Sequence, residues 1–183
     1  MTDKPASELL NFWFSEPLNQ HWFKSTLAID RDIAQRYTQL WQQAANGELD
    51  HWLQSPQTCL ALIILLDQLP LNMFRGQAKS FSTEKQAIET CLYGLDQGYD
   101  QQLSQVQQAF FYMPLMHSEQ LPHQQRSVEL YQRAGLTNNL RFARHHCELI
   151  ERFGRFPHRN AILGRPSTEE EVRYLQSEQA FRG

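Results

Sequence analysis

The sequence predicts an all-α fold, and three observations lead to that prediction. Apolar residues recur at helical spacing through most of the chain. Residues that favour helix starts and stops separate these periodic segments. No run of about five residues alternates strictly with the β-branched enrichment typical of strands. We therefore expect an irregular array of roughly seven to nine helices.

The first half of the chain contains two strong helical patterns. Residues 29–46 place apolar side chains on one face, and Gly47 is a natural stop. Residues 55–70 begin with Ser55 as an N-cap and are expected to end at Pro70. Apolar residues surround nearly the whole circumference of this second segment, which predicts a central buried helix. The aromatic pairs near the start of the chain are expected to lie in the core: Trp13–Phe14 and Trp22–Phe23, with Trp41 and Trp52.

The second half continues the pattern. A helix is predicted from residue 82 to Gly98, and another begins at a capping box of Ser104 with Gln107. Pro114 is expected to kink or end that helix. Three more helices are predicted over residues 121–135, 137–154 and 167–179.

Length and charge limit the possible functions. A chain of 183 residues fits a single domain, residues 1–183, with room for a substantial core. The 17 Lys and Arg against 20 Asp and Glu give a net charge of -3, which disfavours nucleic acid and anionic membranes as partners.

Cysteine usage and the start of the chain favour a reduced, cytoplasmic setting. Cys59, Cys91 and Cys147 are far apart and form no C-x-x-C pair, so we expect three buried thiols rather than disulfides or a zinc site. The N-terminal residues lack the pattern of a secretion signal. The longest apolar run, residues 59–66, is too short to cross a bilayer.

Three polar clusters interrupt the apolar helices and are candidates for a functional site. They consist of Asp67, Gln68, Asn72 and Arg75; His117 and Glu119; and Arg155, His158, Arg159 and Asn160. In paired-helix architectures, successive turns line one groove, so the three clusters are expected to converge.

The first and third clusters lie in two similar turns. Residues 67–76 and 154–164 each follow an apolar helix and contain Pro, then Asn, then Gly. One interpretation is architectural: arginine and asparagine side chains bond the free carbonyls of helix ends, and Asp67 neutralises Arg75 or Arg155. The other is an anion site, because a guanidinium binds phosphate and carboxylate groups through two bonds.

Two histidine-containing segments suggest further chemistry. His117 and Glu119 follow the break at Pro114 and are candidates for an acid/base pair, since a carboxylate orients an imidazole and raises its pKa. The alternative is that His117 caps the kinked helix while Glu119 pairs with a surface cation. His145, His146 and Glu148 supply too few ligands for a metal, so His145 or His146 is expected on a polar face or next to Glu148 and Arg144. Glu169–Glu171 is expected to be a solvated helix start.

Long parts of the sequence resemble one known family. The segments LALIILLDQLPLNMFRGQAKSFSTE, FFYMPLMHSEQ and RFGRFPHRNAILGRPSTEEEVRYL are similar to signature blocks of the bacterial domain of unknown function 924 family. NFWF and HWFKS resemble its N-terminal block. The likeness departs at Leu69 and Leu71, where the family more often has phenylalanine and arginine. It implies a tetratricopeptide-like superhelix of antiparallel helix pairs, and it implies no activity or cofactor.

Two functions are compatible with these features. The first is binding, with or without conversion, of a small anionic metabolite in an arginine- and histidine-lined pocket. The second is a tetratricopeptide-like scaffold that receives a peptide or protein partner on its concave face. No metal site, glycine-rich phosphate loop or serine nucleophile motif is present in the sequence.

Overall fold

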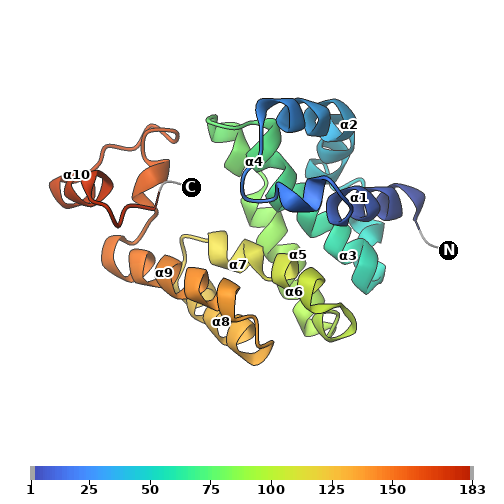
Figure 1. The fold of residues 1–183 in the computed structure, drawn as a ribbon. Coiled ribbons are helices and arrows are strands. Elements are labelled where there is room, and N and C mark those ends of the chain that lie inside the picture. Colours follow the sequence, from blue (N-terminus) through green and yellow to red (C-terminus); the bar gives the residue numbers. More distant parts are fainter. Residues whose placement is uncertain (1–2, 182–183) are drawn as a thin grey trace. The chain divides into compact units, whose positions relative to one another are not determined.

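The computed structural model describes residues 3–181, and within this range the protein is all-α, as predicted (Figure 1). Counting α3 with α4 and α6 with α7 as one interrupted helix each reduces the ten α-helical segments to eight. The segments are α1 (Lys4–Phe14), α2 (Leu27–Ala45), α3 (Pro56–Ile63), α4 (Leu69–Met73), α5 (Glu84–Asp96), α6 (Gln105–Phe111), α7 (Met113–His117), α8 (Leu121–Arg133), α9 (Thr137–Phe153) and α10 (Glu169–Gln176).

These helices belong to two compact units. The N-terminal unit comprises the chain up to Arg75 together with Lys79–Pro114, and the C-terminal unit comprises Gly76–Ala78 and the chain from Leu115 onward. The single-domain organisation expected from chain length stays a prediction. In the described part of the chain, no helix combines the length and apolarity needed to cross a membrane.

Local signals start the helices where the sequence predicts. The Ser55 hydroxyl accepts the Thr58 amide at the start of α3, with Pro56 at the first helical position. Ser104 and Gln107 form the expected capping box at α6. Thr168 and Glu171 form a second capping box at α10. Such caps satisfy the free N–H groups of the first helical turn.

Pro70 does not end the central helix, contrary to prediction. The chain passes from α3 through one π-helical turn, Ile64–Gln68, into α4. Proline has no N–H to donate to the carbonyl of Leu66, four residues earlier. The Thr83 hydroxyl supplies the missing donor, at 2.6 Å from the Leu66 oxygen. A tertiary hydrogen bond therefore allows the helix to continue past its proline.

The core of the N-terminal unit surrounds α3, which packs against α1, α5 and α6. Every side chain from Cys59 to Leu66 is at most 3% exposed, which confirms the predicted central helix. Trp13, Trp41 and Trp52 are also buried, as expected. Phe23 departs from the prediction because it is 73% exposed.

In the C-terminal unit, α8 and α9 pack side by side as a helix hairpin (Figure 1). Gly154 ends α9 with a positive φ of 70°, a conformation that glycine adopts without strain. The reversal brings Phe156 back under the helix, where it joins Leu149, Ile150 and Tyr174 in a hydrophobic cluster. This turn positions the polar residues of the third predicted cluster.

Candidate functional site

The turn after α4 is organised around a buried carboxylate, Asp30 on α2. Its oxygens accept hydrogen bonds from Arg75 Nε at 2.7 Å, Asn72 Nδ2 at 2.8 Å and Ser25 Oγ at 2.8 Å. Burial acts to raise the pKa of Asp30, but these bonds outweigh it and the net pKa is lowered. Arg75 is thus paired with Asp30, and the expected pairing with Asp67 is wrong.

Asp67 and Gln68 lie within the π-helical turn, and each side chain is 6% exposed. The Gln68 amide donates to the Asp67 carboxylate at 2.5 Å. Single π-helical turns inside α-helices often mark functional positions. The first polar cluster therefore lies in the N-terminal unit, and its convergence with the other two stays a prediction.

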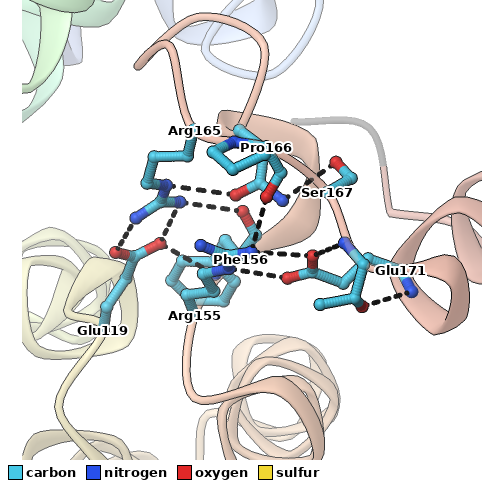
Figure 2. Close-up of polar contacts among 9 residues, drawn as sticks. Glu119, Arg155, Phe156, Arg165, Pro166, Ser167 and Glu171 are labelled. Carbon is cyan, nitrogen blue, oxygen red and sulfur yellow. Dashed lines mark hydrogen bonds and ion pairs between the residues drawn. The ribbon is translucent and has the colours of Figure 1, made fainter.

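The second and third clusters meet within the C-terminal unit, at the carboxylate of Glu119 (Figure 2). Arg165 donates to both Glu119 oxygens, at 2.6 and 2.8 Å, and the Phe156 amide donates to one of them at 2.8 Å. Burial acts to raise the pKa of Glu119, yet these donors lower it overall. Glu119 is therefore bound by the loop after α9, while the acid/base role of His117 and Glu119 stays a prediction.

Arg155 forms the second ion pair of this loop (Figure 2). Its guanidinium donates to both oxygens of Glu171, at 2.7 and 2.8 Å, and to the Pro166 carbonyl at 2.9 Å. Glu171 is only 2% exposed, so the prediction of a solvated helix start is wrong at this residue. The bond from Arg155 is the main cause that lowers the pKa of Glu171 to about 2.

Asn160 bonds two residues at the end of the loop that precedes α10. Its side-chain Nδ2 donates a hydrogen bond to Ser167 Oγ at 3.1 Å, and its side-chain Oδ1 accepts one from Arg165 Nε at 3.1 Å. Asn160 is 1% exposed. The side-chain amide therefore positions the arginine that binds Glu119, instead of bonding a carbonyl at the end of α9 as the architectural interpretation expected.

His117, His146 and His158 lie close to the loop that binds Glu119. Arg159 is 6% exposed, donates to the His117 carbonyl at 2.8 Å and lies 4.7 Å from the Phe156 ring centroid. The rings of His146 and His158 lie 5.3 and 5.6 Å from that same ring. His146 is 5% exposed, so it is not the one of the two histidines that lies on a polar face.

Both histidines are neutral near pH 7. Burial is the main cause that lowers the pKa of His146 to about 3 and that of His158 to about 4. The positive charge of Arg159 is the next contribution at His158. The Nδ1 atom of His158 is buried and has no hydrogen-bond partner.

The comparisons with known proteins agree with the resemblance in the sequence. Residues 9–179 match the family described as "Bacterial protein of unknown function (DUF924)". The chain belongs to the DUF924 family. No curated protein matches it.

A solved structure with the same fold also carries no assigned activity. It is described as "Structure of Protein of Unknown Function ATU0120 from Agrobacterium tumefaciens". The identity is 39%, the TM-score is 0.89, and the match covers 94% of this chain and 97% of the other. DUF924 membership thus fixes the fold, and functional inference depends on the side chains.

Several residues that organise this DUF924 chain were not among the site residues predicted from the sequence. They are Asp30, Arg165, Glu171, His146 and Phe181. Asp30 and Arg165 lie 45 and 46 residues from the partners that bind them, so no local pattern could reveal those pairs. Among the described residues, no group of three or more His, Cys, Asp and Glu side chains is arranged to hold a metal ion.

Proposed function

We propose that this DUF924 protein binds a small anionic metabolite at the cluster formed by His117, His158 and Arg159. The observation that carries the proposal is the buried Nδ1 atom of His158, which has no hydrogen-bond partner. Leaving such an atom unpaired costs about 1–3 kcal/mol, and buried polar groups in native proteins are usually satisfied. A ligand that brings a partner to this nitrogen recovers that free energy.

The charge of the cluster favours an anion. The Arg159 guanidinium carries a permanent positive charge, and its fork of five N–H donors suits carboxylate and phosphate groups. That charge also helps to keep His158 unprotonated. An anion placed here offsets the repulsion and raises the pKa of His158, so binding is coupled to proton uptake.

The remaining predicted ligand residues have different roles within the proposal. Arg155 and Asn160 position the loop through Glu171 and Ser167. Arg75 and Asn72 hold Asp30 in the other unit. Their contribution to binding is therefore indirect, through the position of the backbone, while a ligand-binding role for Asp67 stays a prediction.

A metabolite panel tests this proposal by thermal shift. Carboxylates and phosphorylated compounds are added to the wild type at pH 7.5 and pH 6. A ligand at a hundred times its dissociation constant stabilises the protein by about 2.7 kcal/mol. We expect a stronger shift at the lower pH because His158 takes up a proton.

Two variants make the test specific to this site. His158→Gln should abolish the pH-dependent part of the shift. Arg152→Gln is the matched control, because Arg152 is a half-exposed cation nearby that pairs with Glu170. The proposal fails if no anion shifts the transition at either pH, or if His158→Gln leaves binding and its pH dependence unchanged.

A second function, binding of a protein partner, is favoured by the aromatic surface of the N-terminal unit. Phe23 and Leu27 are 73% and 72% exposed. The Phe23 ring lies parallel to the ring of Phe110, 6.5 Å away. The exposed Phe23 ring offers aromatic area to a partner. Copurification of a stoichiometric partner that is lost in Phe23→Ser would favour this scaffold function.

A further inference from the structure

We propose that residues 177–181, which follow α10, form a lid that closes over His146 and His158 and opens when these histidines are protonated. The role of the lid in admitting a metabolite rests on the proposed function, whereas its opening by acid does not.

The contact of the lid with the histidines is made by one aromatic ring. The Phe181 ring centroid lies 4.6 Å from that of His146 and 5.0 Å from that of His158. The interplanar angles are 66° and 82°, which are edge-to-face arrangements. Since Phe156 also contacts both imidazoles, each histidine ring has two phenylalanine neighbours. Phe181 thus covers a histidine pair that already rests on the hydrophobic cluster.

Beyond Ser177, whose amide and hydroxyl both donate to the Tyr174 carbonyl, few hydrogen bonds hold the lid closed. The Phe181 amide donates to the Tyr174 hydroxyl at 2.8 Å, and the Ala180 amide bonds the Ser177 carbonyl at 3.3 Å. Ala180 and Phe181 are partly buried against the cluster that contains Tyr174. A segment with so few buried contacts belongs to the least stable part of a fold, and such segments commonly open locally.

The charged groups around the histidines favour opening in acid. His146 faces His117, His145 and His158, which oppose its protonation, whereas the hydrogen bond between its Nδ1 atom and the Phe142 carbonyl, at 2.8 Å, favours it. His158 faces the cations Arg159 and Arg165, together with His117. The carboxylate of Glu119 also faces His158 and favours its protonation, but that carboxylate is bound through two bonds by Arg165. The charges of Glu119 and Arg165 offset each other, so a proton on His158 adds positive charge beside the Arg159 guanidinium. A proton on His146 adds positive charge beside three further imidazoles.

Contact with water stabilises the protonated histidines. Burial is the largest cause of the lowered pKa at both histidines, so an imidazolium becomes stable only where water reaches it. In the closed arrangement the His158 Nδ1 atom also lacks a hydrogen-bond partner. When the lid opens, the Phe181 ring moves away and water reaches both imidazoles. Water then hydrates the protonated rings and provides a hydrogen-bond partner for His158 Nδ1.

Histidine titration by nuclear magnetic resonance tests the closing function. The C2 protons of His146 and His158 are followed against pH in the wild type and in Phe181→Ala. We expect both pKa values to rise by about one unit or more in the variant, toward the value of about 6.5 for free histidine. Phe142→Ala is the matched control, because it removes a half-exposed phenylalanine ring from the helix of His146 but keeps the Phe142 carbonyl that His146 Nδ1 bonds. Unchanged titrations in Phe181→Ala would overturn the proposal.

Amide hydrogen exchange tests the opening by acid. The protection of the Phe181 amide, corrected for its intrinsic exchange rate, should fall as the two histidines take up protons. The amides of α9 should stay protected over the same pH range. Tyr174→Phe removes the acceptor of the Phe181 amide and should lower its protection at every pH. Protection of Phe181 that disappears only together with that of α9 would overturn the proposal.

The rate of anion binding distinguishes the lid from the proposed metabolite site. If the lid controls access, Phe181→Ala accelerates binding of any anion that shifts the wild-type transition. If no anion binds, the proposed function fails, and the titration and exchange results still decide whether the lid exists.

Discussion

Glu119 and Arg165 form a two-bonded ion pair that links the start of the α8 region to the loop before α10, with N–O distances of 2.6 and 2.8 Å. The same carboxylate accepts a hydrogen bond from the Phe156 amide. The Glu119 side chain therefore holds both the start of the loop, at Phe156, and its end, at Arg165. Arg165 and Glu119 are each 24% exposed, which places the pair between a surface salt bridge and a buried one. Charge-assisted pairs with two bonds are stronger than single contacts.

The first prediction concerns this pair. Glu119→Gln keeps the shape of the side chain but leaves Arg165 without its counter-charge. We expect a loss of about 2 kcal/mol in the free energy of unfolding, measured by urea denaturation. Glu170→Gln is the control, because its pair with Arg152 is half-exposed and such surface pairs contribute about 0–1 kcal/mol. Equal losses in the two variants would contradict the structural role of Glu119.

The helices could be predicted from sequence because their signals are local. Ser104 and Gln107 are neighbours in one turn, and the capping box they form depends on nothing distant. The candidate site could be predicted only in part. The residue types around Glu119 and Arg159 were evident, but the partner of each arginine is chosen by packing between remote segments. Pro70 illustrates the same limit, since the donor that replaces its N–H is a hydroxyl from Thr83.

The second prediction is a loss of stability in mild acid. The pKa values of His146 and His158 are lowered to about 3 and about 4, whereas both titrate near 6.5 when unfolded. The unfolded chain therefore binds more protons below pH 6.5, and the stabilising contribution present above that pH is lost as the pH falls toward 4. Each histidine contributes a slope of about 1.4 kcal/mol per pH unit.

Replacing the histidines tests that slope. His146→Gln with His158→Gln should flatten the dependence of unfolding free energy on pH between 6.5 and 4.5, above the range in which most carboxylates titrate. Arg152→Gln, at a half-exposed cation that keeps its charge over this pH range, is the control and should retain the wild-type slope. A slope that survives in the double variant would show that other groups cause the acid sensitivity.

The third prediction concerns the packing of Gly94 in α5. A Cβ atom at this position would lie 2.5 Å from Phe111 Cζ and 3.0 Å from Cys59 Sγ, both in the core. Gly94→Ala gains about 1 kcal/mol of helix propensity, but overpacking costs about 1–3 kcal/mol. We expect a net destabilisation by thermal and urea denaturation.

The double variant Gly94→Ala with Phe111→Leu distinguishes a steric clash with Phe111 from a general loss of stability. Leucine lacks the Cζ atom that the new methyl group meets. The cost of Gly94→Ala should therefore shrink or change sign in the Phe111→Leu background. Additive effects of the two substitutions would mean that the close approach is relieved in another way.

The fourth prediction concerns the π-helical turn. Thr83 Oγ1 donates to the Leu66 carbonyl at 2.6 Å and accepts Trp41 Nε1 at 3.2 Å. Thr83→Val removes both bonds without changing the shape of the side chain, and leaves two buried polar groups unpaired. We expect a loss of about 2–4 kcal/mol in unfolding free energy.

Two further variants isolate the cause. Thr90→Val is the matched control, because its hydroxyl bonds a carbonyl within its own helix and its loss should cost less. In the Pro70→Ala background, the alanine N–H is able to donate to the Leu66 carbonyl as in an ordinary helix. Thr83→Val should therefore cost less there than in the wild type. An equal cost in both backgrounds would show that the threonine acts through Trp41 rather than by replacing the donor that proline lacks.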